Sequence, residues 1–306
     1  MDTLAVSSKK RVFLIINPFS GTRRARLGLF TVVDVLCSAG ALVTVQTTQH
    51  RGHATQLAHD AALQGYDVIA CCGGDGTLNE TVSGILSSGA DVPLGYIPAG
   101  STNDFATSMG IPSDFRAAAL GIVNGTPERI DIGRWSDRRY FTYIASFGAF
   151  TAASYNAAQS AKNAIGHLAY LLEGVKDLQS LRPNHIRAVS GGKVYEGDYI
   201  FGAVSSSTSV GGIVKLEHAG VRFDDGLFEV ILVRSPNNIV EFSQIVQAIQ
   251  SSNYTGKMFD FFHASEVTFD MFKPVAWSLD GERADSGRYV AIRNLHRALT
   301  LMRLHD

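Results

Sequence analysis

Residues 68–80 read VIACCGGDGTLNE, and this segment carries the most information about the fold. The opening run, Val68 to Cys72, is apolar and predicts a buried strand. A glycine-rich turn, Gly73 to Gly76, follows the strand, and a segment of helical length, Leu78 to Ser87, ends just before Gly89. A buried strand, a glycine turn and a helix in this order are typical of the repeating unit of a parallel sheet.

The same alternation occupies the rest of the N-terminal part of the chain. Further apolar runs predict strands at Val12 to Ile16, Leu42 to Thr47 and Leu94 to Ile97. The segments Arg24 to Ser38 and His53 to Gln64 have the length of helices and are followed by glycines. Right-handed crossovers would place these strands in a doubly wound parallel sheet with helices on both faces.

From about residue 130 the pattern changes to mainly antiparallel β structure. A hairpin is expected at Gly191-Gly192. The other expected strands are Tyr140 to Ser146, His185 to Ser190, Val194 to Val204, Phe228 to Val233, Glu266 to Phe269, Tyr289 to Arg293 and Leu299 to Leu304, with helices near Ala161 to Leu181 and at Ile239 to Ile249. The change predicts an α/β domain, 1–133, and a β-rich domain, 134–296, and leaves open a return of the segment from about 297 to 306 to the first domain.

Composition places the chain in a broad class without naming a partner. Its 306 residues favour two domains, and 45% hydrophobic residues, 18% charged residues and a net charge of -1 are typical of a globular protein. This charge gives no reason to expect a nucleic-acid partner. Three cysteines, two of them adjacent in an apolar run, predict reduced thiols and a cytoplasmic location. The sequence contains no apolar run of about 18 residues, so membrane contact is expected to be peripheral.

Four polar loops are expected at one edge of the parallel sheet, because each follows the carboxyl end of a strand. They are Asn17 to Gly21, Thr47 to His53, Gly73 to Glu80 and Pro98 to Asp104. Glycines allow backbone N–H groups to approach a polyphosphate, and a following helix N-terminus favours negative charge. Together the loops predict a nucleotide phosphate site.

Two common phosphate-binding motifs are absent from the sequence. There is no G-x-x-x-x-G-K-[ST] loop, and the dinucleotide pattern fails because Asn79 stands where its third glycine belongs. Asp75, a carboxylate within a phosphate loop, would repel an anion unless Mg²⁺ lies between them or the carboxylate orients neighbouring amides. Both interpretations stay open from the sequence alone.

At these residues the sequence resembles the soluble bacterial diacylglycerol kinase and lipid kinase family, whose relatives include sphingosine and ceramide kinases. The motifs that carry the resemblance are Asn17-Pro-Phe-Ser-Gly21, Gly73-Gly-Asp-Gly-Thr-Leu-Asn-Glu80, Gly100-Ser-Thr-Asn-Asp104, Asp131-Ile-Gly133, Asp224-Asp-Gly-Leu227 and Leu279-Asp-Gly-Glu282. The resemblance implies an ATP-dependent kinase whose α/β domain is joined to a β-sandwich-like domain. It also implies a nucleotide held between the two domains and a diacylglycerol-like acceptor at the membrane surface.

The resemblance further implies roles for individual residues. ATP would contact Asn17, Pro18, Phe19, Ser20, Gly21, Thr48, Gly73, Gly74, Asp75, Gly76, Thr77, Leu78, Asn79, Glu80 and Ser101. Mg²⁺ would be held by Asp225 and by the backbone carbonyls of Arg222 and Leu227, with Asp224 as the neighbouring candidate.

Asp280 and Glu282 are the candidate catalytic residues, and either could take the proton from the lipid hydroxyl. If the segment were extended, alternation would direct both side chains to one face, because Gly281 separates them. The alternative interpretation of the pair is a solvated hairpin turn.

The sequence does not fix which lipid is the substrate, and it leaves two alternatives to a lipid kinase open. Glu173 stands where diacylglycerol kinases carry Lys, which leaves the identity of the lipid open. The alternatives are an NAD kinase-like enzyme, which shares the Gly-Gly-Asp-Gly-Thr loop, and a non-catalytic nucleotide or lipid sensor. A homodimer is also left open.

The histidines at 50, 53 and 59 are expected to lie at the surface, and Phe259, Phe261 and Phe262 are expected to pack in the core rather than contact acyl chains.

Overall fold

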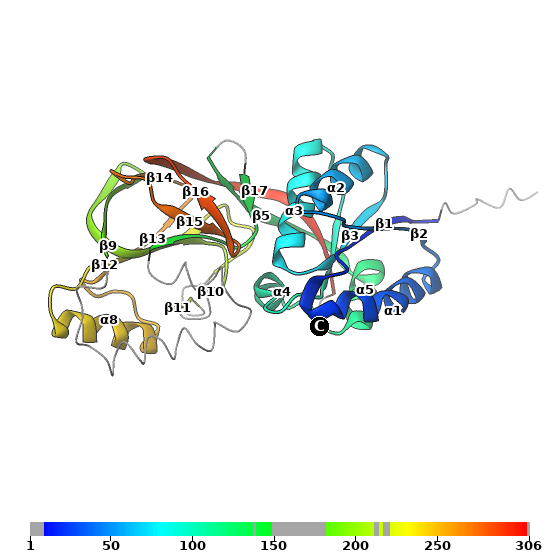
Figure 1. Ribbon diagram of the computed structural model, residues 1–306, viewed down its shortest axis with the longest axis horizontal. Coiled ribbons are helices and arrows are strands. Elements are labelled where there is room, and N and C mark those ends of the chain that lie inside the picture. The colour runs from blue at the N-terminus through cyan, green and yellow to red at the C-terminus, as the bar shows by residue number, and fades with distance from the viewer. Residues whose placement is uncertain (1–8, 137–138, 149–181, 211–213, 217–220, 305–306) are drawn as a thin grey trace, which may run out of the picture. The chain divides into compact units, whose positions relative to one another are not determined.

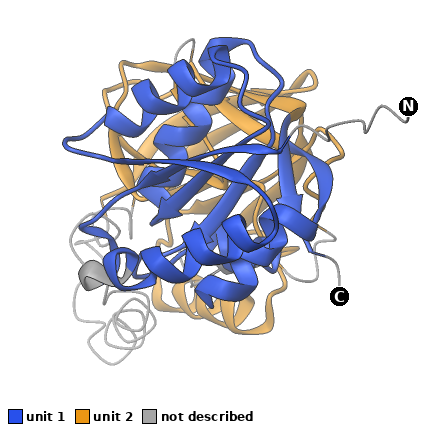
Figure 2. Ribbon diagram, turned by 90° about the vertical axis from the view of Figure 1, so that its right-hand side faces the viewer, with its two compact units in different colours: residues 1–130, 299–306 blue, residues 131–298 orange. Residues whose placement is uncertain are grey.

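The computed structural model describes residues 9–136, 139–148, 182–210, 214–216 and 221–304. The chain divides into two compact units, residues 1–130 with 299–306 and residues 131–298 (Figure 2). The boundary expected at residue 133 falls inside strand β5 (Thr126–Trp135). Each unit contains a hydrophobic core of its own.

The first unit is a parallel sheet with helices on both faces, and its strands are bonded in the order β17-β4-β3-β1-β2. In Figure 1, α2 and α3 lie on one side of these strands, and α1 and α5 lie on the other. The elements are β1 (Arg11–Ile16), the 3-10 helix η1 (Ser20–Arg23), α1 (Arg24–Ser38), β2 (Leu42–Thr47), α2 (His53–Leu63), β3 (Val68–Gly73), α3 (Asp75–Ser88), β4 (Leu94–Pro98), α4 (Asp104–Met109), α5 (Phe115–Asn124) and the end of β17 (Tyr289–Arg303).

The predicted parallel sheet is confirmed. β3 and β4 are buried along their whole length, as strands covered by helices on both faces must be. Helix α3 ends where Gly89 adopts a left-handed conformation, with φ of 70°. Helix α5 was not anticipated, although its start carries a recognisable signal: the Asp114 side chain accepts a hydrogen bond from the backbone N–H of Ala117.

The second unit is mainly antiparallel. Its elements are β5, β6 (Arg139–Phe141), β7 (Ile144–Gly148), β8 (Asn184–Ser190), β9 (Lys193–Ser205), β10 (Ser209–Val210), β11 (Val214–Lys215), β12 (Phe228–Arg234), α8 (Ile239–Ser251), β13 (Phe259–Ala264), β14 (Glu266–Asp270), β15 (Ala276–Leu279), β16 (Glu282–Asp285) and the first part of β17. The first part of β9 pairs with β8, and its end pairs with β7 and β12. The hairpin expected at Gly191-Gly192 is present, since Ser190 pairs with Lys193 and both glycines have positive φ.

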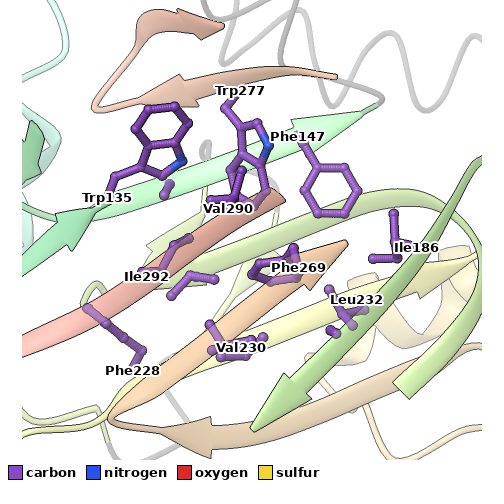
Figure 3. Packing of buried hydrophobic residues seen from close by; sticks show 14 of the residues in the cluster. Trp135, Phe147, Ile186, Phe228, Val230, Leu232, Phe269, Trp277, Val290 and Ile292 are labelled. Carbon is purple, nitrogen blue, oxygen red and sulfur yellow. The ribbon is translucent and has the colours of Figure 1, made fainter. Parts of the chain in front are cut away.

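Large apolar side chains from several strands fill the core of the second unit (Figure 3). The Trp277 ring centroid lies 4.9 Å from that of Phe147 and 5.2 Å from that of Phe269. Phe228, Val230 and Leu232 alternate along β12 and face this core. The strand that carries the candidate catalytic hairpin, β15, is therefore fixed by Trp277.

Three expectations about the second unit need correction or lie outside the described residues. The run from Tyr140 to Ser146 is two strands, because the backbone N–H groups of Thr142 and Tyr143 donate to the Asp280 carboxylate. The strands expected at 289–293 and 299–304 are one strand, β17, which contains an irregularity at Arg297, with φ of 51°. The helix expected near 161–181, which includes Glu173, lies outside the described residues.

The aromatic group at Phe259, Phe261 and Phe262 forms part of strand β13, and Phe262 stacks on Tyr195 with ring centroids 4.1 Å apart. Among the helices that the structure describes, none has the length and apolar character needed to cross a membrane.

Candidate active site

The polar loops at the strand ends of the first unit are bonded directly to one another. The Asn17 side-chain amide donates to the Thr77 hydroxyl at 3.0 Å, which links the loop after β1 to the loop after β3. The backbone N–H of Gly74 donates to the Ser20 hydroxyl at 3.3 Å across the same two loops. The convergence expected from the sequence is therefore present in the structure.

Glycines allow three of these loops to approach backbone to backbone. A Cβ atom on Gly21, where φ is 50°, would lie 2.2 Å from the carbonyl oxygen of Ala99. A Cβ atom on Gly100 would lie 2.5 Å from the Cα of Gly74 and 2.7 Å from the Asn103 side-chain oxygen. The glycines are thus required by the contacts between the loops themselves, before any phosphate is considered.

Asp75 orients amides of the neighbouring loop, one of the two roles left open by the sequence. Its carboxylate accepts hydrogen bonds from the backbone N–H groups of Asp104 at 3.2 Å and Phe105 at 3.3 Å, and from the Thr102 hydroxyl at 3.3 Å. Asp75 is 8% exposed. A buried carboxylate bonded to the start of helix α4 is a positioning group, because its oxygens already hold the loop after β4.

Glu80 connects the remaining loop in the same way. Its carboxylate accepts from the backbone N–H groups of Gly52 at 2.7 Å and Ala54 at 3.2 Å, at the start of helix α2. The Thr55 hydroxyl donates to the Glu80 backbone carbonyl at 3.0 Å. Thr48, at the beginning of this loop, is buried. All four loops are consequently joined through side chains of the Gly73–Glu80 segment.

Helix α3 gives this region its electrostatic character. The helix starts at Asp75, directly after the loop, and its first intrahelical bond runs from the N–H of Leu78 to the carbonyl of Gly74. The amides of the first turn therefore lie at the positive end of the helix dipole. Ser101, which follows in the loop after β4, is exposed. Backbone amides, hydroxyls and a helix N-terminus together form an arrangement that can bind phosphate groups.

In the second unit, Asp280 and Gly281 form a two-residue turn between β15 and β16. Leu279 pairs with Glu282 across the turn, and φ is 50° at Asp280 and 83° at Gly281. Asp-Gly is a preferred sequence for this turn because both positions need positive φ. A turn thus separates Asp280 from Glu282, and the alternation that an extended segment would give does not apply to this pair.

The two carboxylates have different surroundings. Asp280 is 4% exposed, and its carboxylate accepts from the backbone N–H groups of Thr142, Tyr143 and Ile144 at 2.6 to 3.1 Å and from the Thr142 hydroxyl at 2.9 Å. Glu282 is the first residue of β16 and is partly exposed. Asp280 therefore holds the hairpin to Thr142, Tyr143 and Ile144, whereas Glu282 is the more exposed of the two residues.

The loop with the candidate metal ligands is also organised by its neighbours. Asp225 accepts a hydrogen bond from the N–H of Leu227 at 3.0 Å, which brings the two expected ligands together in one turn. Asp224 is bound by Arg297 at 2.7 Å and Arg222 at 3.3 Å. The hydrogen bond from Arg297 is the main cause that lowers the pKa of Asp224. Of the two carboxylates, Asp225 is the more exposed.

Asp131 supports this loop, a role that its motif did not reveal. Its carboxylate accepts from the backbone N–H groups of Gly226 at 2.6 Å and Arg297 at 2.7 Å, and from the Asn294 amide at 3.4 Å. Arg297 is also the residue at which β17 is irregular. The buried Asp131 carboxylate therefore fixes both the turn that contains Gly226 and strand β17.

Glu229 is a buried acid that the sequence interpretation did not single out. It is 2% exposed on β12, and its Oε2 atom has no hydrogen-bond partner. Burial raises the pKa of Glu229 to about 8. The available signal was a charged residue within an apolar run, Phe228 to Val233.

The described residues contain no cluster of three or more His, Cys, Asp or Glu side chains arranged to hold a metal ion. His50 stacks on His53, with ring centroids 4.8 Å apart. Cys71 and Cys72 are buried free thiols, and burial raises the pKa of the Cys72 thiol to about 12.

Comparison with known proteins agrees with this arrangement of elements and loops. A family model described as the diacylglycerol kinase catalytic domain matches residues 11–135, and one described as the YegS C-terminal NAD kinase beta sandwich-like domain matches residues 144–302. The chain is 34% identical to a diacylglycerol kinase of Bacillus subtilis (strain 168) over 89% of this chain and 90% of the relative. It is 31% identical to a diacylglycerol kinase of Staphylococcus aureus (strain MRSA252) over 90% of this chain and 86% of the relative.

A solved structure described as a diacylglycerol kinase from Bacillus anthracis str. Sterne superposes with a TM-score of 0.73 and 20% identity, covering 97% of this chain and 98% of that chain. Another structure from the same organism reaches a TM-score of 0.79 at 22% identity with the same coverage. Both structures are similar to this chain in fold. The two matched models and the relatives above 30% identity show that this chain belongs to the diacylglycerol kinase family.

Proposed function

We propose that this chain transfers the γ-phosphoryl group of MgATP to a hydroxyl of diacylglycerol or of a similar lipid. The observation that carries the proposal is the set of four loops, joined by Asp75 and Glu80, at the N-terminus of helix α3. Phosphoryl transfer needs a site that holds the triphosphate, a metal that spreads its charge and a base that orients the acceptor hydroxyl. Membership of the diacylglycerol kinase family supports the choice of ATP as donor and a lipid as acceptor.

The nucleotide is proposed to bind at the loops of the first unit. The contacting residues would be Asn17 to Gly21, Thr48, Gly73 to Glu80 and Ser101. Backbone amides in the first turn of α3 and the hydroxyls of Ser20 and Thr77 are suited to phosphate oxygens. Asp75 and Glu80 act through the amides that they hold, since both carboxylates are bonded to backbone N–H groups.

Mg²⁺ is proposed to bind at the turn that contains Asp225, with the backbone carbonyls of Arg222 and Leu227. A carboxylate and two carbonyls are hard oxygen donors, which suit this cation, and the Asp225–Leu227 hydrogen bond shows that the turn is compact. Asp224 fits a ligand role less well, because Arg222 and Arg297 already compensate its charge. When bound, the ion supplies positive charge; Asp131 keeps the turn in place through Gly226.

Glu282 is proposed as the general base. In the reaction, Glu282 accepts the proton of the lipid hydroxyl, the hydroxyl oxygen forms a bond to the γ-phosphorus, and the bond between this phosphorus and the bridging oxygen breaks to release ADP. Asp280 serves as a positioning residue, because its oxygens are bonded to three backbone N–H groups at the start of β7. The turn between them fixes Glu282 relative to that framework.

The protein is proposed to work in the cytoplasm as a peripherally membrane-associated enzyme, since its acceptor is a lipid. Nothing in the family comparison favours an NAD kinase-like activity or a non-catalytic sensor over the lipid kinase.

Incubation of the purified chain with γ-labelled ATP and Mg²⁺ in the presence of separate acceptors tests this function. The panel should contain diacylglycerol, monoacylglycerol, a sphingoid base, undecaprenol and NAD, each lipid in detergent micelles. We expect label in the phosphorylated diacylglycerol class. Label in NADP, or in none of the products while ATP still binds, would instead support one of the two alternatives.

A further inference from the structure

Asn103 is the residue directly before helix α4, in the loop after β4. Asparagine is a preferred residue at this position, because its side-chain oxygen usually accepts a hydrogen bond from the first turn of the helix. Here the Asp75 carboxylate takes this place, since it accepts from the backbone N–H groups of Asp104 and Phe105. The Asn103 side chain makes no such bond to the described residues of α4, so it has a different role.

The Asn103 amide closes the turn that precedes it. Its Oδ1 atom accepts from the backbone N–H of Gly100 at 2.8 Å, and its Nδ2 atom donates to the Gly100 carbonyl at 3.1 Å. Asn103 is 9% exposed, so water competes little for these bonds. One side chain therefore binds both backbone polar groups of Gly100, and this pair of bonds fixes the orientation of that residue.

The backbone at position 103 restricts the choice of residue. Its φ of 52° and ψ of 50° lie in the left-handed region, which residues with a Cβ rarely adopt, asparagine being one of the exceptions. Glycine would adopt this conformation but has no side chain to bind Gly100, and an ionised aspartate has no donor for the Gly100 carbonyl. Asparagine meets both the conformational and the hydrogen-bonding requirements of this position.

The closed turn links two parts of the proposed phosphate site. At one end, an added Cβ on Gly100 would lie 2.5 Å from the Cα of Gly74, the residue before helix α3. Within the turn, Ser101 is exposed, and the Thr102 hydroxyl donates to Asp75 at 3.3 Å. A change in the orientation of Gly100 would therefore move both Ser101 and the backbone that contacts Gly74.

We propose that Asn103 is a positioning residue for the phosphoryl donor. By holding Gly100, it keeps Ser101 and the backbone amides at the start of α3 in the arrangement that binds the phosphate groups of ATP. This inference rests on the proposed function, because it assumes that these loops bind MgATP. A purely structural role, in which Asn103 only helps the loop to fold, would change stability without changing the affinity for MgATP.

The test compares the parent with Asn103→Gly, Asn103→Ala and the control Asn238→Gly. Both Asn103 variants lose the two bonds to Gly100, but only alanine adds strain, because it has a Cβ in the left-handed region. Asn238 is the corresponding residue before helix α8 in the second unit, and its side chain accepts from the backbone N–H of Glu241 at 3.0 Å. Titration calorimetry measures the Kd of MgATP, thermal unfolding measures stability, and diacylglycerol phosphorylation in micelles gives kcat and the KM for ATP.

We expect both Asn103 variants to bind MgATP about tenfold or more weakly than the parent, because the turn loses the bonds that orient Gly100. The two variants should show the same loss of affinity, although Asn103→Ala should unfold at a lower temperature than Asn103→Gly. The KM for ATP should rise with the Kd, and kcat at saturating ATP should change less than KM. Asn238→Gly should retain the Kd and the KM of the parent.

A parent-like Kd in Asn103→Gly would overturn the proposal and leave Asn103 a structural residue. An affinity that falls in proportion to stability across all three variants would overturn it as well, because general destabilisation would then explain the loss. If Asn103→Ala does not fold, the comparison of Asn103→Gly with Asn238→Gly still decides between these outcomes. A parent that binds MgATP but phosphorylates no lipid would instead contradict the proposed function, and the calorimetric test of Asn103 would be unaffected.

Discussion

Asp280 and Glu282 are separated by a single glycine, yet the structure gives them different surroundings. Three backbone N–H groups and a hydroxyl bind the Asp280 carboxylate, and the residue is almost completely buried. Glu282 is partly exposed at the start of β16. This difference in burial and hydrogen bonding is the reason that Glu282, rather than Asp280, is proposed as the general base.

The substitution Asp280→Asn should destabilise the protein. The new amide group would point a donor at a backbone N–H donor, leaving buried N–H groups unsatisfied, at about 1–3 kcal/mol. Asp285→Asn is a matched control in the same hairpin, because the Asp285 side chain is 74% exposed, and its effect should be within about 0.5 kcal/mol. Urea unfolding measures the free energy of unfolding of both variants. Equal stability of the two variants would show that Asp280 does not anchor the hairpin.

Glu229 should make the stability depend on pH. Burial raises its pKa from the ordinary value of 4.5 to about 8, so the folded state binds more protons than the unfolded state between these values. The contribution of Glu229 to stability is therefore fully present below pH 4.5 and is lost as the pH rises toward 8, by at most about 1.4 kcal/mol for each pH step of one. The Glu229→Gln variant lacks this titrating group. Its free energy of unfolding, relative to that of the parent, should therefore increase as the pH rises across this range.

Urea unfolding in EDTA at several pH values measures this effect without interference from bound metal. Glu196→Gln, on the neighbouring strand β9, is an exposed control. If the parent and Glu229→Gln lose stability in parallel as pH rises, the Glu229 carboxyl titrates normally in the folded protein.

At the scale of elements, the loops of the first unit are held by contacts with one another. The position of Gly100 illustrates this, since its backbone meets that of Gly74 and the side chain of Asn103. The loop after β3 and the loop after β4 therefore move together, and a change in either should alter the phosphate site.

Gly100→Ala should weaken MgATP binding by about tenfold or more, because the added methyl group would separate the two loops. Gly256→Ala provides the control, since a Cβ atom at Gly256 meets no atom within 4 Å. Titration calorimetry with MgATP measures both affinities. Parent-like affinity in Gly100→Ala would mean that this contact between the loops does not shape the nucleotide site.

Asp225→Asn should abolish the stabilisation of the protein by Mg²⁺, whereas Asp224→Asn should retain it. A ligand that binds only the folded state at about 100 times its Kd stabilises it by about 2.7 kcal/mol. Thermal unfolding with Mg²⁺ and with EDTA measures the difference. The reverse result, with Asp224 essential and Asp225 dispensable, would move the metal to the carboxylate that Arg222 and Arg297 now bind.

Elements with a strong local pattern were predictable from the sequence. β2 and α1 have the predicted bounds, Leu42–Thr47 and Arg24–Ser38, because apolar runs and glycine stops are local signals. The continuity of β17 was not predictable, since it depends on Asp131, distant in sequence, accepting the N–H of Arg297. The sequence left open whether 280–282 is extended or a hairpin turn, and the structure shows a turn, because Asp280-Gly281 is itself a turn signal that outweighs the strand pattern on either side.

For the candidate site, the sequence predicted which loops converge but not what each carboxylate does. Asp75 and Glu80 were expected to contact the nucleotide, and only their bonds to the starts of α4 and α2 identify them as positioning groups. Hydrogen bonds between residues far apart in the chain leave no local pattern, so these assignments required the structure.

At the scale of the whole molecule, the chain combines two units with separate cores. The first unit contains the loops that we propose bind the phosphate groups, and the second contains the turn with Asp225 and the hairpin with Glu282. The central claim is that nucleotide binding belongs to the first unit and proton transfer from the acceptor belongs to the second. The claim predicts that the two functions can be separated by mutation.

The most direct test is turnover and MgATP affinity of Glu282→Gln, measured with γ-labelled ATP and diacylglycerol in micelles. Removal of a general base typically lowers the rate by about 10²- to 10⁴-fold, while the loops of the first unit are unchanged. We therefore predict a loss of this size in kcat with the MgATP Kd and the thermal stability of the parent. Turnover at the parent rate would contradict the account, because Glu282 would then be only a residue of the hairpin.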